Sequence, residues 1–151
     1  LKIVQHILKK HPNTYLLSVG AGSPEAEIHG LANDLGISDH VLFLGEREDI
    51  AELLKAMDVF LLPSLYEGLP IVAVEAQAAN VKLVMSTEVS EDTVLSENVR
   101  FVPLDADLDR WEAEVMGEPK GNRPKPEMEA FDMLKTAKAL EKIYDAKEVT
   151  A

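Results

Sequence analysis

The chain has 151 residues, of which 46% are hydrophobic and 28% charged, a length and composition that fit one globular domain and exclude a disordered, collagenous or coiled-coil chain. Asp and Glu number 27 against 15 Lys and Arg, so the formal net charge is −12, and a body this acidic disfavours nucleic acid and anionic membranes as partners. Cysteine is absent, which excludes disulfides and thiolate metal sites; with no apolar run long enough to span a bilayer and no targeting pattern, we expect a cytoplasmic protein.

Short apolar runs alternate with helical patterns along the sequence. Apolar residues recurring every three or four positions predict helices, and unbroken apolar runs of four or five residues predict buried strands. We expect strands at 15–19, 41–45, 59–62, 82–85 and 99–102. We expect helices at 3–10, from an N-cap at Ser23 to Gly36, at 49–57, at 70–80 and around 108–115, with a helical turn at 92–96. A linker at 117–126 and a last helix at 127–145 complete the chain.

The predicted strands are continuously apolar rather than alternating, which is typical of strands covered on both faces; residues 59–62 are one example. The sequence therefore predicts an α/β fold, a Rossmann-like parallel sheet of about five strands with helices on both faces, in a single partial domain over residues 1–151. Ligands of such sheets bind outside the carboxyl ends of the strands. The loops at 20–23, 45–49, 63–70 and 86–93 are therefore the places to look for a site.

The loop at 63–70 carries the strongest signal because it leads from a strand end into a helix N-terminus. Gly68 has no side chain, so a ligand can approach its backbone, and the helix dipole and first-turn amides favour an anion there. Pro70 has no N–H to donate, so the donors are the amides of Leu69 and Ile71. Glu67 lies at the same rim, although a loop glutamate alone is more often a solvated charge.

Glu75 is unusual because its helix is apolar almost all round, a pattern typical of a buried helix. A buried carboxylate is costly unless it is hydrogen-bonded, and no Lys or Arg lies within one helical turn. Two neighbouring ribose hydroxyls could donate to it. The alternative, that Glu75 faces solvent or caps another element, is equally open at this point.

The remaining polar positions are weaker signals. Gly20 and Gly22 form half of a dinucleotide fingerprint, for which a plain tight turn is an equal explanation. Arg47 could meet a base or phosphate, but a surface pair with a neighbouring acid is the favoured interpretation. Trp111 is expected in the core. The histidines do not recur at metal-ligand spacing, so we expect no metal site, and a solvated helix face is expected at Glu112, Glu114 and Glu118.

Several segments together resemble a known family, namely residues 19–22, 35–45, 58–70 and 74–78. The glutamate pair Glu67 and Glu75, with Pro-Ser before it and Gly-Leu-Pro within it, is the most specific part. The chain resembles, from about residue 1 to residue 144, the C-terminal donor-binding domain of the family 4 retaining glycosyltransferases of GT-B fold. Within that family it is most similar to the bacterial exopolysaccharide or capsule type.

The resemblance implies a role for each matching position. Glu75 would hold the ribose hydroxyls of a nucleotide, and Glu67 would be the catalytic residue that hydrogen-bonds hydroxyls of the donor sugar. The diphosphate would lie on the backbone of Gly68, Leu69, Pro70 and Ile71. The nucleotide would be bordered by Gly20, Gly22, Phe43 and Arg47.

The resemblance also implies the reaction and its partners. The donor would be a nucleoside diphosphate sugar, with a UDP-sugar expected, and the sugar would pass with retention to a growing polysaccharide or lipid-linked acceptor. No metal and no other cofactor would be needed. The full enzyme would be cytoplasmic, with a peripheral association at the inner face of the membrane compatible with its acceptor.

Two parts of the family pattern are not in this sequence: the N-terminal acceptor domain, and a strand followed by an Arg and a Lys that clamp the diphosphate. We therefore expect the chain to be inactive alone. Either the remaining strands close into a sheet of order 2-1-3-4-5, or a partner chain or residues outside this chain fill the place between strands 15–19 and 59–62. Two other functions stay open: a non-catalytic nucleotide- or sugar-binding module, and a flavodoxin-like interaction domain.

Overall fold

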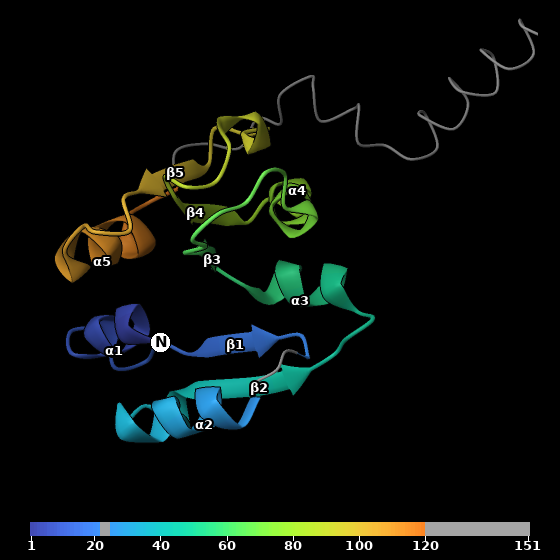
Figure 1. Cartoon of the computed structure of the whole chain (residues 1–151). Helices are drawn as coiled ribbons and strands as arrows, with labels where there is room; N and C mark the ends of the chain where they lie inside the picture. Colours follow the sequence, from blue (N-terminus) through green and yellow to red (C-terminus); the bar gives the residue numbers. More distant parts are fainter. Residues whose placement is uncertain (22–24, 120–151) are drawn as a thin grey trace, which may run out of the picture.

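The protein is described by a computed structural model, which defines residues 1–21 and 25–119 (Figure 1). Helices and strands alternate as α1 (Lys2–Leu8), β1 (Leu16–Val19), α2 (Glu25–Asp34), η1 (Ser38–His40), β2 (Val41–Gly45), α3 (Ile50–Ala56), β3 (Val59–Leu62), α4 (Ile71–Ala78), β4 (Lys82–Ser86), η2 (Glu91–Thr93), β5 (Val99–Val102) and α5 (Leu108–Met116). The α/β class is therefore confirmed. The predicted N-cap at Ser23, the linker beyond residue 119 and the helix at 127–145 lie outside the described residues.

The strands form two parallel sheets, one of order β1-β2 and one of order β3-β4-β5. The closed order 2-1-3-4-5 is therefore wrong, because within the described ranges no ladder joins β1 to β3. In Figure 1 the two sheets are separate, with β1 and β2 on one side of α3 and β3 to β5 on the other. Each of β1 and β3 consequently has one edge that pairs with no strand in the described chain, as do β2 and β5 at the other ends of their sheets.

Burial along the strands follows this topology. β4 is buried at all five residues because it has a partner on each side and helices above and below. β1 and β3 are only half-buried throughout. Phe60 and Leu62 of β3 pack against one core cluster. Val59 and Leu61 pack against another, so residues 59–62 are covered on both faces as expected. These residues are only half-buried because β3 ends its sheet and leaves one strand edge open.

The core lies mainly around the three-stranded sheet, and it includes Trp111 as expected. Trp111 of α5 packs with Val84 and Val102, and Ile3 of α1 packs against the same cluster. α1 also contributes Val4 to the small core of the two-stranded sheet. One helix thus contacts both halves of the fold, and its packing against α5 is what connects them.

Helix ends follow from local sequence. Gly36, just beyond α2, has a φ of +67°, and Ile37 N donates to Ala32 O at 3.0 Å. Asn80 takes the same left-handed conformation after α4, with a φ of 68°. Such residues complete the hydrogen bonds of the last turn and stop the helix. Within the described chain, no helix has the length and apolar character that crossing a bilayer requires.

Candidate functional site

The loop between β3 and α4 is held in place through the backbone of Glu67. Its amide donates to Glu88 O at 3.4 Å, and its carbonyl accepts from Ser90 N at 3.1 Å. Glu67 and Val89 form an isolated parallel bridge, so the two strand-end loops run side by side. A loop glutamate is usually mobile, whereas these two bonds fix where the Glu67 side chain starts.

Two serines add to this support. Ser86, fully buried at the end of β4, donates to Ser64 O at 2.5 Å. Ser64 in turn donates to Glu67 Oε1 at 3.4 Å. The Glu67 carboxylate is half-buried and accepts a hydrogen bond from its own loop. It is therefore oriented at the carboxyl ends of β3 and β4, where the fold rule places a ligand.

The start of α4 presents an uncapped helix N-terminus beside Glu67. Pro70 is the N-cap residue and no side chain accepts from the first-turn amides. The first amides of a helix have no partner within the helix, and they carry its positive dipole end. Open space surrounds Gly68, where an added Cβ would meet nothing within 4 Å. The segment from Gly68 to Ile71 can therefore receive an anion.

Gln77 of α4 holds the connection between β4 and β5 in place beside the Glu67 loop. This residue was not identified from the sequence. Its amide nitrogen donates to Ala73 O at 3.0 Å and to Thr93 O at 2.8 Å. Its amide oxygen accepts from Leu95 N at 2.7 Å. This buried amide fastens α4 to the connection between β4 and β5, the same connection that pairs with Glu67. A glutamine amid alanines carries no spacing signal that could have revealed this.

Glu75 is exposed, so of the two alternatives left open by the sequence, a buried carboxylate and one that faces solvent, the structure shows the second. α4 buries Ala73, Val74, Ala76 and Gln77, while Ile71 and Glu75 lie on its open side. The open side of α4 also carries an apolar residue, Ile71. The helix therefore looks apolar all round in the sequence although it leaves a carboxylate in water. Within the described chain its carboxylate has no hydrogen-bonding partner, so it is available to a ligand without needing one for stability.

A second group of predicted residues lies at the ends of β1 and β2. Gly20 N donates to Gly45 O at 2.8 Å, and both glycines have positive φ, +119° and +62°. The positive φ of Gly20 would strain a residue with a side chain, so the backbone requires glycine there. Phe43 stacks with His29 of α2, with ring centroids 3.7 Å apart. Gly22 lies outside the described residues.

Arg47 behaves as the favoured interpretation predicts. Its guanidinium makes two hydrogen bonds to Asp49, Nε to Oδ1 at 2.8 Å and Nη2 to Oδ2 at 2.6 Å. The Asp49 bonds raise the pKa of Arg47, and the Arg47 hydrogen bond lowers the pKa of Asp49. Both side chains are exposed, so this is a surface ion pair. Nε and Nη2 of the guanidinium already donate to Asp49.

The structure thus collects the predicted residues into two groups. Glu67, the segment from Gly68 to Ile71 and Glu75 share the loop and helix after β3. Gly20, Phe43 and Arg47 lie at the ends of the other sheet. Only the first group combines a hydrogen-bonded carboxylate, an uncapped helix N-terminus and a free carboxylate.

Comparisons with known proteins show which family the chain resembles. The family model described as "Glycosyl transferases group 1" matches residues 1–103. The putative glycosyltransferase EpsF of Bacillus subtilis (strain 168) is 36% identical over 129 residues, which is 84% of this chain and 33% of the relative. The chain therefore spans about a third of that relative's length.

Solved structures show the same fold. Sucrose-phosphate synthase from Thermosynechococcus elongatus aligns with a TM-score of 0.69 at 23% identity, covering 96% of this chain and 42% of the other. Anabaena Alr3699/HepE, solved in complex with UDP and glucose, aligns with a TM-score of 0.58 at 27% identity over 68% of this chain and 30% of the other. With a family model covering most of its described residues, the chain belongs to the glycosyl transferases group 1 family.

Proposed function

We propose that this chain is the donor-binding part of a retaining glycosyltransferase and binds a nucleoside diphosphate sugar at the junction of β3 and α4. The observation that carries the proposal is the fixed Glu67 carboxylate beside the uncapped N-terminus of α4. A carboxylate that accepts hydrogen bonds, next to a site for an anion, suits a ligand that joins sugar hydroxyls to a phosphate group. The UDP and glucose bound by the HepE structure support this donor class.

The chemistry follows from the two groups. In transfer, the bond between the anomeric carbon and the diphosphate oxygen breaks and the diphosphate leaves with the electron pair. Amides at the start of α4 and the helix dipole stabilise that negative charge, so no metal ion is required for it. Glu67 accepts hydrogen bonds from donor-sugar hydroxyls and holds the anomeric carbon in place. The acceptor oxygen then bonds to the anomeric carbon on the same face of the sugar, and the proton of the acceptor hydroxyl passes to the departing diphosphate oxygen.

Glu75 would hold the ribose. Its carboxylate is exposed on the open side of α4, about one helical turn beyond the anion site. Two neighbouring ribose hydroxyls can donate to its two oxygens. UDP is the nucleotide we propose, and a glycan or lipid-linked molecule is the acceptor. The turn at Gly20 and the strand end at Phe43 would border the base from the other sheet.

The proposal includes a part that this chain does not supply. β1 and β3 each leave an edge unpaired, and a parallel strand from outside this chain would join the two sheets and bring both residue groups to one rim. We propose that such a strand, together with an acceptor-binding domain, completes the enzyme. The chain alone would be inactive in transfer.

Calorimetric titration of the chain with UDP, GDP and ADP tests the donor site. Glu75→Gln should weaken UDP binding roughly 10- to 100-fold, because hydrogen bonds to a charged group are worth about 1.5–3 kcal/mol. Glu67→Gln should leave UDP binding unchanged but weaken a UDP-sugar relative to UDP. Glu52→Gln, an equally exposed glutamate on α3, is the matched control. Equal affinities for the chain and Glu75→Gln would refute the ribose role.

Transfer itself is tested on a longer protein that adds an acceptor-binding domain. Sugar transfer that Glu67→Gln abolishes supports the enzyme. Donor binding without transfer in that longer protein would instead favour a non-catalytic binding module.

A further inference from the structure

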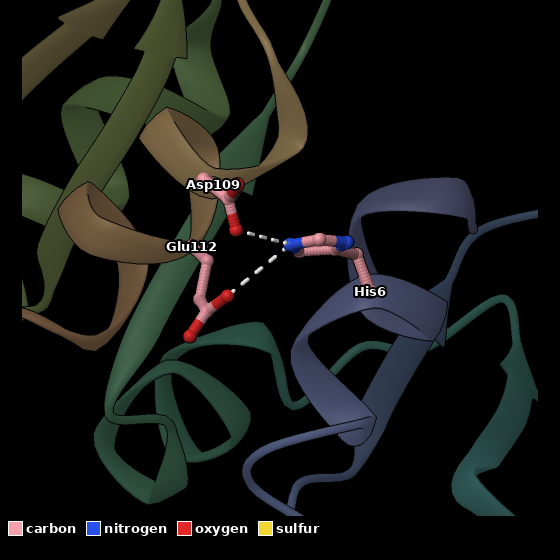
Figure 2. A group of neighbouring side chains, drawn as sticks. All are labelled: His6, Asp109 and Glu112. Atoms are coloured by element: carbon pink, nitrogen blue, oxygen red, sulfur yellow. Dashed lines mark hydrogen bonds and ion pairs between the residues drawn. The ribbon is translucent and has the colours of Figure 1, made fainter.

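A cluster of ligand-type side chains lies where α1 packs against α5, apart from the residues of the donor site. His6 Nε2 is 2.9 Å from Asp109 Oδ1 and 3.2 Å from Glu112 Oε2. Figure 2 shows the imidazole of His6 directed from α1 toward both carboxylates of α5. His6 lies 103 residues before Asp109 in the sequence, so no sequence spacing could have indicated that it meets the two acids of α5.

The donor set and its spacing suit a small divalent transition metal ion. One imidazole nitrogen and two carboxylate oxygens lie within 4.8 Å of one another. Zn²⁺ prefers these donors at about 2.1 Å in tetrahedral geometry, which separates neighbouring ligand atoms by about 3.4 Å. The two distances from His6 Nε2, 2.9 and 3.2 Å, need to widen by only a few tenths of an ångström. Mg²⁺ and Ca²⁺ prefer oxygen ligands alone, so the imidazole favours a transition metal.

The carboxylates are ready to bind a cation. Hydrogen bonds from His6 and Lys10 lower the pKa of Asp109, and a hydrogen bond from Lys10 lowers that of Glu112. Both groups are therefore anionic at neutral pH, as metal ligation requires. The Glu112 side chain is only 9% exposed, which corrects the expectation of a solvated face at this residue. An anion this shielded is compensated by the ammonium of Lys10, two residues beyond the end of α1.

Lys10 and His11 complete the surroundings. The Lys10 ammonium lies 3.3 Å from Asp109 Oδ1 and 2.9 Å from Glu112 Oε2, so it competes with a metal ion for the same oxygens. Its side chain is 57% exposed, which leaves it room to swing into solvent. His11 Nε2 is 3.4 Å from the other oxygen, Glu112 Oε1, where it orients the carboxylate as a second imidazole.

We propose that His6, Asp109 and Glu112 bind one Zn²⁺ ion at the α1–α5 interface, with a water molecule as the fourth ligand and Lys10 as the competing cation. The site is structural. It fastens α1, the helix that contacts both sheets, to α5. It is distinct from the donor site and takes no part in sugar transfer.

The test uses the metal-free chain, with Zn²⁺ measured by competition against a chromophoric chelator and Co²⁺ measured by its visible absorption. We expect one ion per chain, and intense visible bands for Co²⁺ that indicate tetrahedral coordination. His6→Asn and Asp109→Asn should each weaken Zn²⁺ binding at least tenfold. Lys10→Met should strengthen it, because the competing ammonium is gone. Zn²⁺ should also raise the urea midpoint of the chain, and should not raise that of His6→Asn.

Two variants separate loss of the Zn²⁺ site from a general effect of the substitutions. His40→Asn removes an imidazole that bonds Thr14 O, outside the cluster, and should leave Zn²⁺ binding unchanged. Asp109 is largely exposed, so Asp109→Asn tests the site even if His6→Asn fails to fold. Absence of saturable Zn²⁺ binding would overturn the proposal. Equal losses in His6→Asn and His40→Asn, or full affinity in Asp109→Asn, would also overturn it.

Discussion

Replacing Gln77 by Leu removes the amide that fastens α4 to the connection between β4 and β5. Leucine fills a similar volume, so the change tests the hydrogen bonds rather than the packing. Thr93 O and Leu95 N then lose their partners in a region that is almost fully buried. Ala73 O loses little, because as a helix carbonyl it keeps the backbone bond of its own turn.

The magnitude follows from the two groups left without a partner. Each buried polar group that loses its hydrogen bond costs about 1–3 kcal/mol, and the added apolar side chain recovers part of this. We expect the free energy of unfolding to fall by about 2–4 kcal/mol. The loop at 87–95 should loosen as well, because Gln77 is what ties it to α4.

Urea unfolding followed by circular dichroism measures the first effect, and amide hydrogen exchange of residues 87–95 measures the second, with β2 as an internal reference. Thr93→Val is the matched control, because the Thr93 hydroxyl is buried and unpaired within the described chain. Its loss should leave stability unchanged or slightly higher. A Gln77→Leu variant that unfolds within about 0.5 kcal/mol of Thr93→Val would refute the reasoning.

Three further predictions concern single features of the fold. Asn80→Gly should raise the free energy of unfolding by about 0.5–1 kcal/mol, measured in urea, because glycine adopts the left-handed conformation that ends α4 without strain. Arg47→Ala should leave both the urea midpoint and UDP affinity unchanged, since its partner is the exposed Asp49; a clear loss of UDP affinity would show a nucleotide contact. Asp109 and Glu112 have folded-state pKa values below their unfolded values, so their contribution is present above about pH 4 and lost as the pH falls below it; the urea midpoint should drop over that window, and drop less in Asp109→Asn.

Local elements could be predicted from the sequence because each depends on neighbouring residues. All five strands lie within one residue of their predicted ranges, since unbroken apolar runs bounded by turns define them. The end of α2 at Gly36 and the start of α4 after Pro70 follow from the conformations that these residues favour.

Long-range features could not be predicted in this way. Nothing in the residues of β1 or β3 specifies which strand lies beside them, so two arrangements stayed open and only the structure excluded the closed order. The apolar composition of α4 did not reveal that Glu75 lies on its open side. His6 and Glu112 meet only because α1 packs on α5, and Glu112 read alone is one acid among several on an amphipathic helix.

The Glu67 motif is different, because its meaning is local. A strand, a loop and a helix start within a dozen residues, and together they determine where the carboxylate and the first-turn amides lie. The Glu67 backbone bonds to residues 88 and 90 still required the structure. The residue types were readable in the sequence, whereas the second loop that fixes them was not.

The unpaired edges of β1 and β3 have a consequence for handling the isolated chain. Backbone amides and carbonyls along an open edge are templates for another polypeptide, and a second copy is the nearest source when the chain is concentrated. Edge-to-edge self-association would therefore compete with any binding measurement. Dilute conditions, or an added peptide that saturates the edges, would keep the molecule monodisperse long enough for its chemistry to be measured.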